Sequence, residues 1–163
     1  MASTDPEPTL LVVWHSRTGA SETMARAAAQ SDNCRILPAG NVGPDDLMAA
    51  AGYLFICPEN LAALSGGMKE MFDAAYYPVL GRIEGRPYAT IIAAGSDGEN
   101  AQKQLDRIAK GWRLKRVADP MIVNFDAQTP EAILADKTVP DDVIEQCREL
   151  GEGLAEGIRM GVF

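Results

Sequence analysis

The sequence has few of the residues from which metal centres and disulfide-rich scaffolds are built. It contains three cysteines and one histidine among 163 residues. Cys34, Cys57 and Cys147 form no closely spaced pair, so we expect reduced thiols rather than a disulfide framework or a metal site. Long apolar runs are missing too, since none approaches the roughly 20 residues that a membrane-spanning helix needs. We therefore expect no bound metal and no insertion into a membrane.

Positive charge is the second scarce property. Lys and Arg total 15 and Asp and Glu total 23, which gives a net charge of −8 at pH 7. Domains that bind nucleic acid or anionic lipid surfaces carry basic patches, so this balance argues against both kinds of partner. Residues 1–9 include Asp5, Glu7 and two prolines, unlike the basic and apolar start of a secretion signal. We expect a cytoplasmic protein.

The rest of the composition is that of a globular domain. Apolar residues make up 47% of the chain and charged residues 23%, which is enough to bury a core and excludes disorder over most of the length. A length of 163 residues fits one domain, at roughly 100–200 residues per domain. We predict a single domain over residues 1–163, with residues 1–8 as a flexible N-terminal extension.

Short apolar runs alternate with amphipathic stretches along the chain. The apolar runs predict five strands, at residues 10–14, 34–37, 53–57, 88–94 and 117–125. Helical patterns and start signals predict helices at residues 20–30, 45–50, 65–75 and 100–112, and a last helix from residue 141. Strands that alternate with helices pair in parallel through right-handed crossovers. The predicted fold class is α/β, a three-layer doubly wound sandwich.

Proline and serine residues mark three expected boundaries. Pro58 is expected to end the third strand, and Ser65 to cap the helix that follows. Residues 126–140 form the longest irregular stretch, within which Pro130 can start a short helical turn.

The segment after the first strand is a candidate phosphate site. Ligands of open parallel sheets bind outside the carboxyl ends of the strands. Residues 15–21, His-Ser-Arg-Thr-Gly-Ala-Ser, form a glycine-containing turn that opens a helix, with donor hydroxyls on Ser16, Thr18 and Ser21. Unpaired backbone N–H groups and the helix dipole favour an anion there, although the turn has no lysine. The alternative is an ordinary strand–helix turn whose serine and threonine side chains cap the helix.

These residues carry a resemblance to a known family. Residues 16–25, Ser-Arg-Thr-Gly-Ala-Ser-Glu-Thr-Met-Ala, resemble the phosphate loop of the flavodoxin-like superfamily. Residues 57–73 contain Cys-Pro-Glu-Asn-Leu-Ala, then Ser-Gly-Gly-Met-Lys and Phe-Asp, and resemble the third-strand loop of its NAD(P)H-dependent, FMN-containing oxidoreductases. Residues 94–100 lie where that family packs a loop beside the flavin ring. The resemblance covers nearly the whole chain in element order.

The resemblance implies a five-stranded parallel sheet in the order 2-1-3-4-5, with FMN as cofactor. The first loop would hold the FMN phosphate, the second would contact the pyrimidine edge of the ring, and the third would pack on the other side. The FMN-binding residues so implied are Ser16, Arg17, Thr18, Gly19, Ala20, Ser21, Pro58, Glu59, Asn60, Leu61, Ala62, Gly95, Ser96, Asp97 and Gly98. No catalytic side chain is implied, because the flavin itself carries the hydride chemistry.

The function that the resemblance implies is an oxidoreductase that passes electrons from NAD(P)H through FMN to a small acceptor, either a quinone or a flavin. Two alternatives stay open. One is a one-electron carrier that docks on a redox protein, which a net charge of −8 would suit. The other is a flavodoxin-shaped domain that has lost flavin binding. A homodimer that completes the ring site across subunits also fits the resemblance.

Four further residues each have two interpretations. Neither ring loop contains an aromatic residue, so Tyr76 and Tyr77 could reach the ring from the third helix or from a second subunit, or could form a helix-end packing pair. His15 could relay protons, although an ordinary strand-end residue is the simpler interpretation. We interpret Cys57 as a small buried hydrophobic residue rather than a redox thiol.

Overall fold

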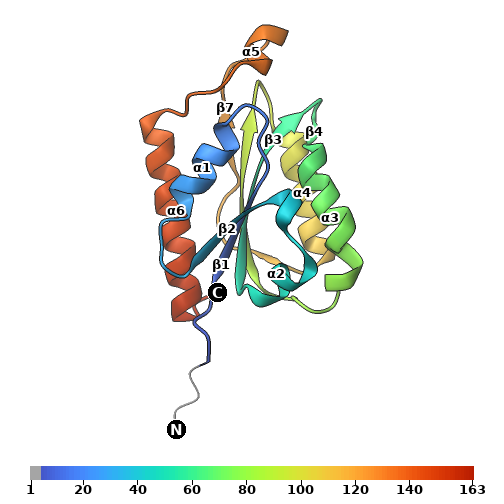
Figure 1. Cartoon of the computed structure of the whole chain (residues 1–163), viewed down its shortest axis with the longest axis vertical. Coiled ribbons are helices and arrows are strands. Elements are labelled where there is room, and N and C mark those ends of the chain that lie inside the picture. Colours follow the sequence, from blue (N-terminus) through green and yellow to red (C-terminus); the bar gives the residue numbers. More distant parts are fainter. Residues whose placement is uncertain (1–4) are drawn as a thin grey trace.

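A parallel β-sheet separates two layers of helices in the structure, a computed structural model that describes residues 5–163 (Figure 1). The strands are β1 (Leu10–Trp14), β2 (Cys34–Pro38), β3 (Gly52–Asn60), β4 (Ala63–Leu64), β5 (Pro87–Ala94), β6 (Lys115–Arg116) and β7 (Met121–Asn124). The helices are α1 (Ala20–Ala28), α2 (Pro44–Ala49), α3 (Gly66–Val79), α4 (Glu99–Gly111), α5 (Pro130–Leu134) and α6 (Asp141–Met160), with a short 3-10 turn at Ala39–Asn41.

The order of the strands across the sheet is β2-β1-β3-β5-β6, with β7 also paired to β5. Every one of these pairings is parallel, and β4 alone adds to β3 in the antiparallel sense. Since β5 is the predicted fourth strand and β6 and β7 together are the predicted fifth, the α/β class and the order 2-1-3-4-5 are confirmed.

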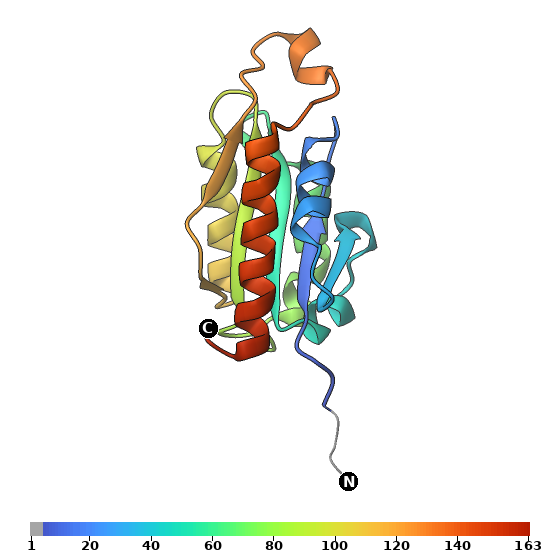
Figure 2. The same ribbon diagram turned by 90° about the vertical axis from the view of Figure 1, so that its left-hand side faces the viewer.

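The two faces of the central strands are both apolar, as expected for a sheet that is covered on both sides. Alternate residues of β1 point to opposite faces. Leu10 and Val12 pack with α1 and α6, whereas Leu11 and Val13 pack in the cluster that α2, α3 and α4 cover. Figure 2, which turns the molecule by a quarter, shows α6 running along the length of the face that carries Leu10 and Val12, with α1 beside it. Within residues 5–163, no helix is both long enough and apolar enough to cross a membrane.

The third strand does not stop at Pro58, which corrects the prediction. It continues to Asn60 and pairs Pro58 with Ala93 of β5. The carbonyl oxygen of Ile56 accepts from the backbone N–H of His15 at 3.0 Å, so the backbone groups of Ile56 point toward β1. The backbone of Pro58, two residues later, points to the same side. β1 has ended by this point, with Trp14 as its last residue paired to β3, so no residue of β1 pairs with Pro58.

The fifth strand also differs from the prediction, because it is two short strands rather than one. Residues 117–120 separate β6 from β7, and Pro120 lacks the N–H that a continuous strand would need there.

Of the predicted N-terminal extension, residues 1–4 lie outside the described residues. Glu7 accepts from Arg159 Nε at 2.5 Å, and the carbonyl of Pro8 accepts from Asn33 Nδ2 at 3.2 Å.

Candidate functional site

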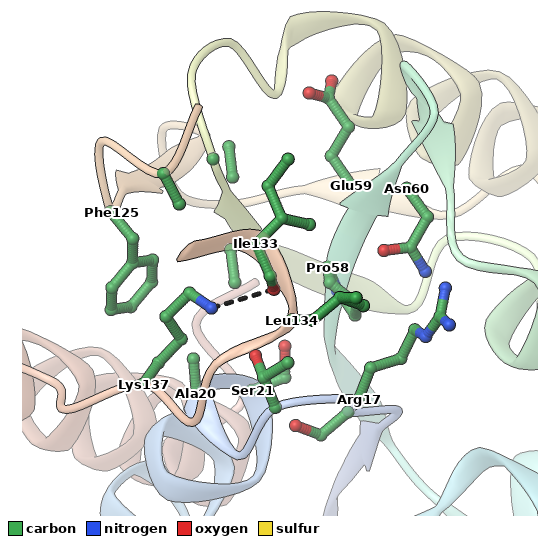
Figure 3. Close-up of a pocket in the computed structure, with 16 residues that line it drawn as sticks. Arg17, Ala20, Ser21, Pro58, Glu59, Asn60, Phe125, Ile133, Leu134 and Lys137 are labelled. Atoms are coloured by element: carbon green, nitrogen blue, oxygen red, sulfur yellow. Dashed lines mark hydrogen bonds between the residues drawn. The ribbon is translucent and has the colours of Figure 1, made fainter. Parts of the chain in front are cut away.

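A pocket opens at the carboxyl ends of the central strands, at the end of the molecule where α5 lies in Figure 1. Its walls come from the loop after β1, the end of β3, the end of β5 and the connection from β7 to α6. The lining residues are Ser16, Arg17, Thr18, Ala20, Ser21, Pro58, Glu59, Asn60, Ala93, Ala94, Gly95, Phe125, Ala127, Ile133, Leu134 and Lys137 (Figure 3).

The loop after β1 is folded so that its backbone donors meet at the start of α1. Gly19 is the N-cap residue, with φ of 93°, a left-handed conformation that a glycine adopts without strain. It has no side chain to cap the first helical N–H groups, and a helix start leaves up to four of them without an internal partner. Ser16 Oγ accepts from the Gly19 N–H at 3.0 Å, so the Ser16 hydroxyl proton is still free to donate.

Ser21 carries an unpaired polar atom at the pocket. The residue is 1% exposed, and its hydroxyl oxygen is buried without a hydrogen-bond partner although the side chain lines the pocket. A buried hydroxyl left unpaired costs about 1–3 kcal/mol. An acceptor bound in the pocket, beside the positive end of α1, would remove that cost.

The end of β3 supplies a second unpaired group. The Oε2 atom of Glu59 is buried without a hydrogen-bond partner, and the residue lines the same pocket together with Asn60. After Asn60 the chain turns through Leu61 and Ala62 and returns as β4, which pairs Asn60 with Ala63. The sequence predicts a loop after Pro58, and the structure has a tight hairpin there instead.

The tip of that hairpin is strained and exposed. Leu61 and Ala62 have φ of 51° and 59°, a region that costs a residue with a Cβ roughly 1–2 kcal/mol. Leu61 is fully exposed, and the Ala62 carbonyl accepts from Asn100 Nδ2 at 2.5 Å. Neither residue lines the pocket.

The loop after β5 reaches the pocket through Gly95 alone. A Cβ on Gly95 would lie 2.7 Å from the carbonyl oxygen of Ala127, whose N–H donates back to Gly95 at 2.8 Å. The lack of a side chain at Gly95 therefore lets the β7–α6 connection pack closely against it. The sequence instead predicted that a ligand would approach this glycine. Ser96, Asp97 and Gly98 do not line the pocket, and Gly98 is the N-cap of α4.

The connection from β7 to α6, residues 125–140, forms the remaining wall, and we call it the strap. The backbone N–H of Phe125 donates to Ala94 at 2.8 Å and that of Lys137 donates to Thr18 at 2.9 Å, so the strap bridges β5 and the loop after β1. Sequence reasoning treated this stretch as irregular chain and assigned it no site residue. One feature of the sequence could have predicted its role. The stretch follows the last strand, and ligands of such sheets bind at the carboxyl ends of the strands.

The predicted site residues thus divide into two groups. Those that line the pocket are Ser16, Arg17, Thr18, Ala20, Ser21, Pro58, Glu59, Asn60 and Gly95, and those that do not are Gly19, Leu61, Ala62, Ser96, Asp97 and Gly98. The lining residues that were not predicted are Ala93, Ala94, Phe125, Ala127, Ile133, Leu134 and Lys137.

His15 and Cys57 lie behind the pocket, and neither lines it. His15 Nδ1 is 2.8 Å from Ser65 Oγ, and burial and the nearby Arg17 lower the His15 pKa. Ser65 is the N-cap of α3, as predicted, but its side chain bonds to His15 instead of a helix N–H. Burial raises the pKa of Cys57 to about 12, so its thiol is not a nucleophile at neutral pH.

Tyr76 and Tyr77 do not reach the pocket of their own chain. They belong to the C-terminal end of α3, at the opposite edge of the sheet (Figure 1). The Tyr76 ring stacks on Trp112 with centroids 5.8 Å apart, and its carbonyl accepts from the indole N–H at 3.0 Å. The helix-end packing pair is the correct interpretation within one chain. The aromatic side chain that does line the pocket is Phe125.

The chemistry of the pocket is that of an anion site joined to an apolar slot. Hydroxyl and N–H donors gather at the start of α1, whereas Ala93, Phe125 and Leu134 give the strap side an apolar surface. Among residues 5–163, no three His, Cys, Asp or Glu side chains are arranged to hold a metal ion. The arrangement suits a ligand with a phosphate at one end and an apolar body.

Solved structures show which fold this is. A flavodoxin from the domain Archaea superposes with a TM-score of 0.75 at 16% identity, over 93% of this chain and 99% of its own. A WrbA-like flavodoxin from Agrobacterium tumefaciens gives a TM-score of 0.75 at 19% identity, over 94% and 98%. An NADPH-quinone reductase from P. pentosaceus gives 0.62 at 13% identity, over 88% and 97%. No family model and no curated protein matches the sequence. The chain therefore has the flavodoxin-like fold.

Proposed function

We propose that the protein binds FMN in this pocket and passes electrons from NAD(P)H to a small acceptor, a quinone or a free flavin. The observation that carries the proposal is the buried, unpaired hydroxyl of Ser21 at the start of α1. A phosphate oxygen placed there would satisfy the hydroxyl and accept from the first-turn N–H groups at the same time. The proposal includes a cytoplasmic location and no nucleic-acid or membrane partner.

The residues present fit the phosphate end of FMN. Ser16, Thr18 and Ser21 line the pocket with hydroxyl groups, and the cap at Gly19 leaves the helix N–H groups uncovered. These donors would hold the phosphate, and hydrogen bonds to an ionised group are roughly twice as strong as neutral ones.

The other end of the pocket fits the flavin ring. The pyrimidine edge of a flavin offers an N–H between two carbonyl groups. The unpaired Oε2 of Glu59 is an acceptor suited to that N–H, and Asn60 beside it adds an amide. Phe125 and Leu134 give the ring an apolar surface on the strap side, which the loop sequences alone did not offer.

The protein's own part in this function is binding and orientation. FMN, when bound, supplies the redox chemistry, accepting hydride from a nicotinamide and delivering electrons to the acceptor. The residues of the pocket would fix the phosphate at α1 and keep water from the slot between β3, β5 and the strap. No side chain is needed as an acid or base, and the position of His15 behind the pocket agrees with that.

A one-electron carrier is the second candidate function. The net charge of −8 favours it, because an acidic surface steers a carrier onto a basic redox partner. The fully exposed Leu61 at the hairpin tip would give such a partner an apolar contact. The loss of flavin binding is a weaker candidate, because Ser21 and Glu59 keep unpaired polar atoms at the pocket.

Turnover separates these functions. The protein is loaded with FMN, freed of excess flavin, and mixed with NADH or NADPH and a soluble quinone. Saturable oxidation of one nicotinamide, faster than with the same concentration of free FMN, is the expected result. A protein that holds FMN but oxidises neither nicotinamide is a carrier, and the oxidoreductase proposal is then wrong.

A further inference from the structure

The strap brings a lysine to a phosphate loop that has none of its own. Lys137 lines the pocket together with Ser16, Thr18 and Ser21, although it lies far from them in the sequence. Figure 3 shows its side chain entering from the strap on the side of the pocket that Ala20 and Ser21 form.

The backbone holds Lys137 in this place. Its N–H donates to the Thr18 carbonyl at 2.9 Å, which joins the strap directly to the loop after β1. Two residues on, Val139 is buried in the core cluster that α1 and α6 share. The Lys137 backbone is therefore anchored beside the loop after β1. The length of a lysine side chain is enough to reach from there to the donor groups of that loop.

Among residues 5–163, the Lys137 ammonium group has only neutral partners. It donates to the carbonyl oxygens of Ala132 at 2.7 Å, Ile133 at 3.0 Å and Ala135 at 2.5 Å, all on the strap itself. A hydrogen bond from an ammonium to an ionised oxygen is stronger than one to a neutral carbonyl. A lysine also has a flexible four-carbon stem, so the group can exchange a carbonyl for a phosphate oxygen without moving the backbone.

The other cation of the pocket is less suited to this role. Arg17 is exposed, and in Figure 3 its side chain extends toward Asn60, on the opposite side of the pocket from Lys137. A separate sign that a ligand belongs at the Lys137 side is Ser21, which is 1% exposed with its hydroxyl unpaired.

We propose that Lys137 is a phosphate-binding residue whose ammonium group supplies, from the strap, the positive charge that the loop after β1 lacks. The inference rests on the proposed function, which places the FMN phosphate at that loop. The strap is then part of the site, because it selects the phosphorylated flavin over riboflavin, in addition to covering the pocket.

The test is the affinity of the wild-type protein and of Lys137→Met for FMN and for riboflavin, followed by flavin fluorescence. We expect Lys137→Met to weaken FMN binding about tenfold and riboflavin binding by less than about twofold, since a charge-assisted bond is lost only with FMN. Higher salt should weaken FMN binding to the wild type more than to Lys137→Met. Lys137→Arg should restore most of the FMN affinity. Lys110→Met, an exposed lysine at the far end of α4, is the matched control and should change neither affinity.

The outcomes that overturn the inference are distinct from those that overturn the function. Equal losses for FMN and riboflavin would show that the ammonium only holds the strap together, and no loss for either would show that it contacts neither flavin. If the wild type binds neither flavin, the proposed function is wrong, and inorganic phosphate becomes the probe. Phosphate that raises the melting temperature of the wild type but not of Lys137→Met supports the inference, and phosphate without effect on either overturns it.

Discussion

His15 Nδ1 and Ser65 Oγ are 2.8 Å apart, and their contact joins the end of β1 to the start of α3. Gly67 packs against the imidazole so closely that a Cβ there would overlap the ring. The histidine thus ties the start of the loop after β1 to α3, although it does not itself line the pocket. Its burial has a measurable consequence, because it is the single histidine of the chain.

The His15 pKa should lie below 6.5, since burial and the Arg17 charge both favour the neutral ring. Just below pH 6.5 the unfolded chain binds a proton at His15 that the folded chain does not bind. The free energy of unfolding therefore falls as the pH drops below 6.5, and this decrease ends below the pKa of His15 in the folded protein. NMR of the imidazole C–H signal gives the midpoint directly. A midpoint at or above 6.5 would contradict the half-buried contact with Ser65.

Ser21→Ala should separate stability from binding. The change removes a buried hydroxyl that has no partner in the free protein, so we expect the free energy of unfolding to stay equal or rise by as much as about 1–2 kcal/mol. FMN affinity should fall about tenfold, because one phosphate donor is lost. Thr23→Ala, an exposed hydroxyl on the same helix, is the control: it should leave FMN affinity unchanged and raise the free energy of unfolding by no more than about 0.7 kcal/mol, from helix propensity. A large loss of stability in Ser21→Ala would mean that the hydroxyl is bonded inside the protein.

Two glycines of α6 should respond in opposite ways to alanine. A Cβ on Gly151 would lie 1.8 Å from the carbonyl oxygen of Ala28, the last residue of α1, whereas a Cβ on Gly153 meets nothing within 4 Å. We expect Gly151→Ala to cost about 1–3 kcal/mol from overpacking and Gly153→Ala to gain about 0.5–1 kcal/mol from helix propensity. Urea unfolding of the two variants measures both values. Equal effects would show that α1 and α6 do not pack as described.

The hairpin tip offers a test of backbone strain. Ala62 has φ of 59°, so Ala62→Gly should raise the free energy of unfolding by about 0.5–1 kcal/mol, although glycine also gains freedom in the unfolded chain. Ala63→Gly, one residue on in β4, lacks that strain and should destabilise. Thermal unfolding of the two variants measures both changes. If both variants were less stable than the wild type, the hairpin described here would be contradicted.

The sequence predicted those parts of the fold that depend on local patterns. Apolar runs at β1 and β5 are buried on both faces, so they read as strands without knowledge of their neighbours. The turn at Gly19 was recognisable because a glycine stands between a strand and a helix rich in alanine. The predicted end of the third strand was wrong because the free-energy cost of Pro58 in β3 depends on where β1 ends. The residues near Pro58 in the sequence do not contain that information.

The strap could not be predicted as part of the site for the same physical reason. Residues 125–140 carry no period of either helix or strand beyond the short α5, so local pattern assigns them no face. Their position depends on the bond from Lys137 to Thr18, which joins residues far apart in the chain. The hairpin at Leu61 and Ala62 was hidden too, because this turn usually carries Asn-Gly rather than two residues with a Cβ.

The central claim is that the donors at the start of α1 grip the phosphate of FMN, and a paired titration tests it most directly. Wild-type protein and Thr18→Ala are titrated with FMN and with riboflavin, and the quenching of flavin fluorescence gives each affinity. We predict that the wild type binds FMN at least about tenfold more tightly than riboflavin, and that Thr18→Ala reduces this preference, because the variant loses a phosphate donor alone. Equal affinity of the wild type for the two flavins, or binding of neither, would contradict the account.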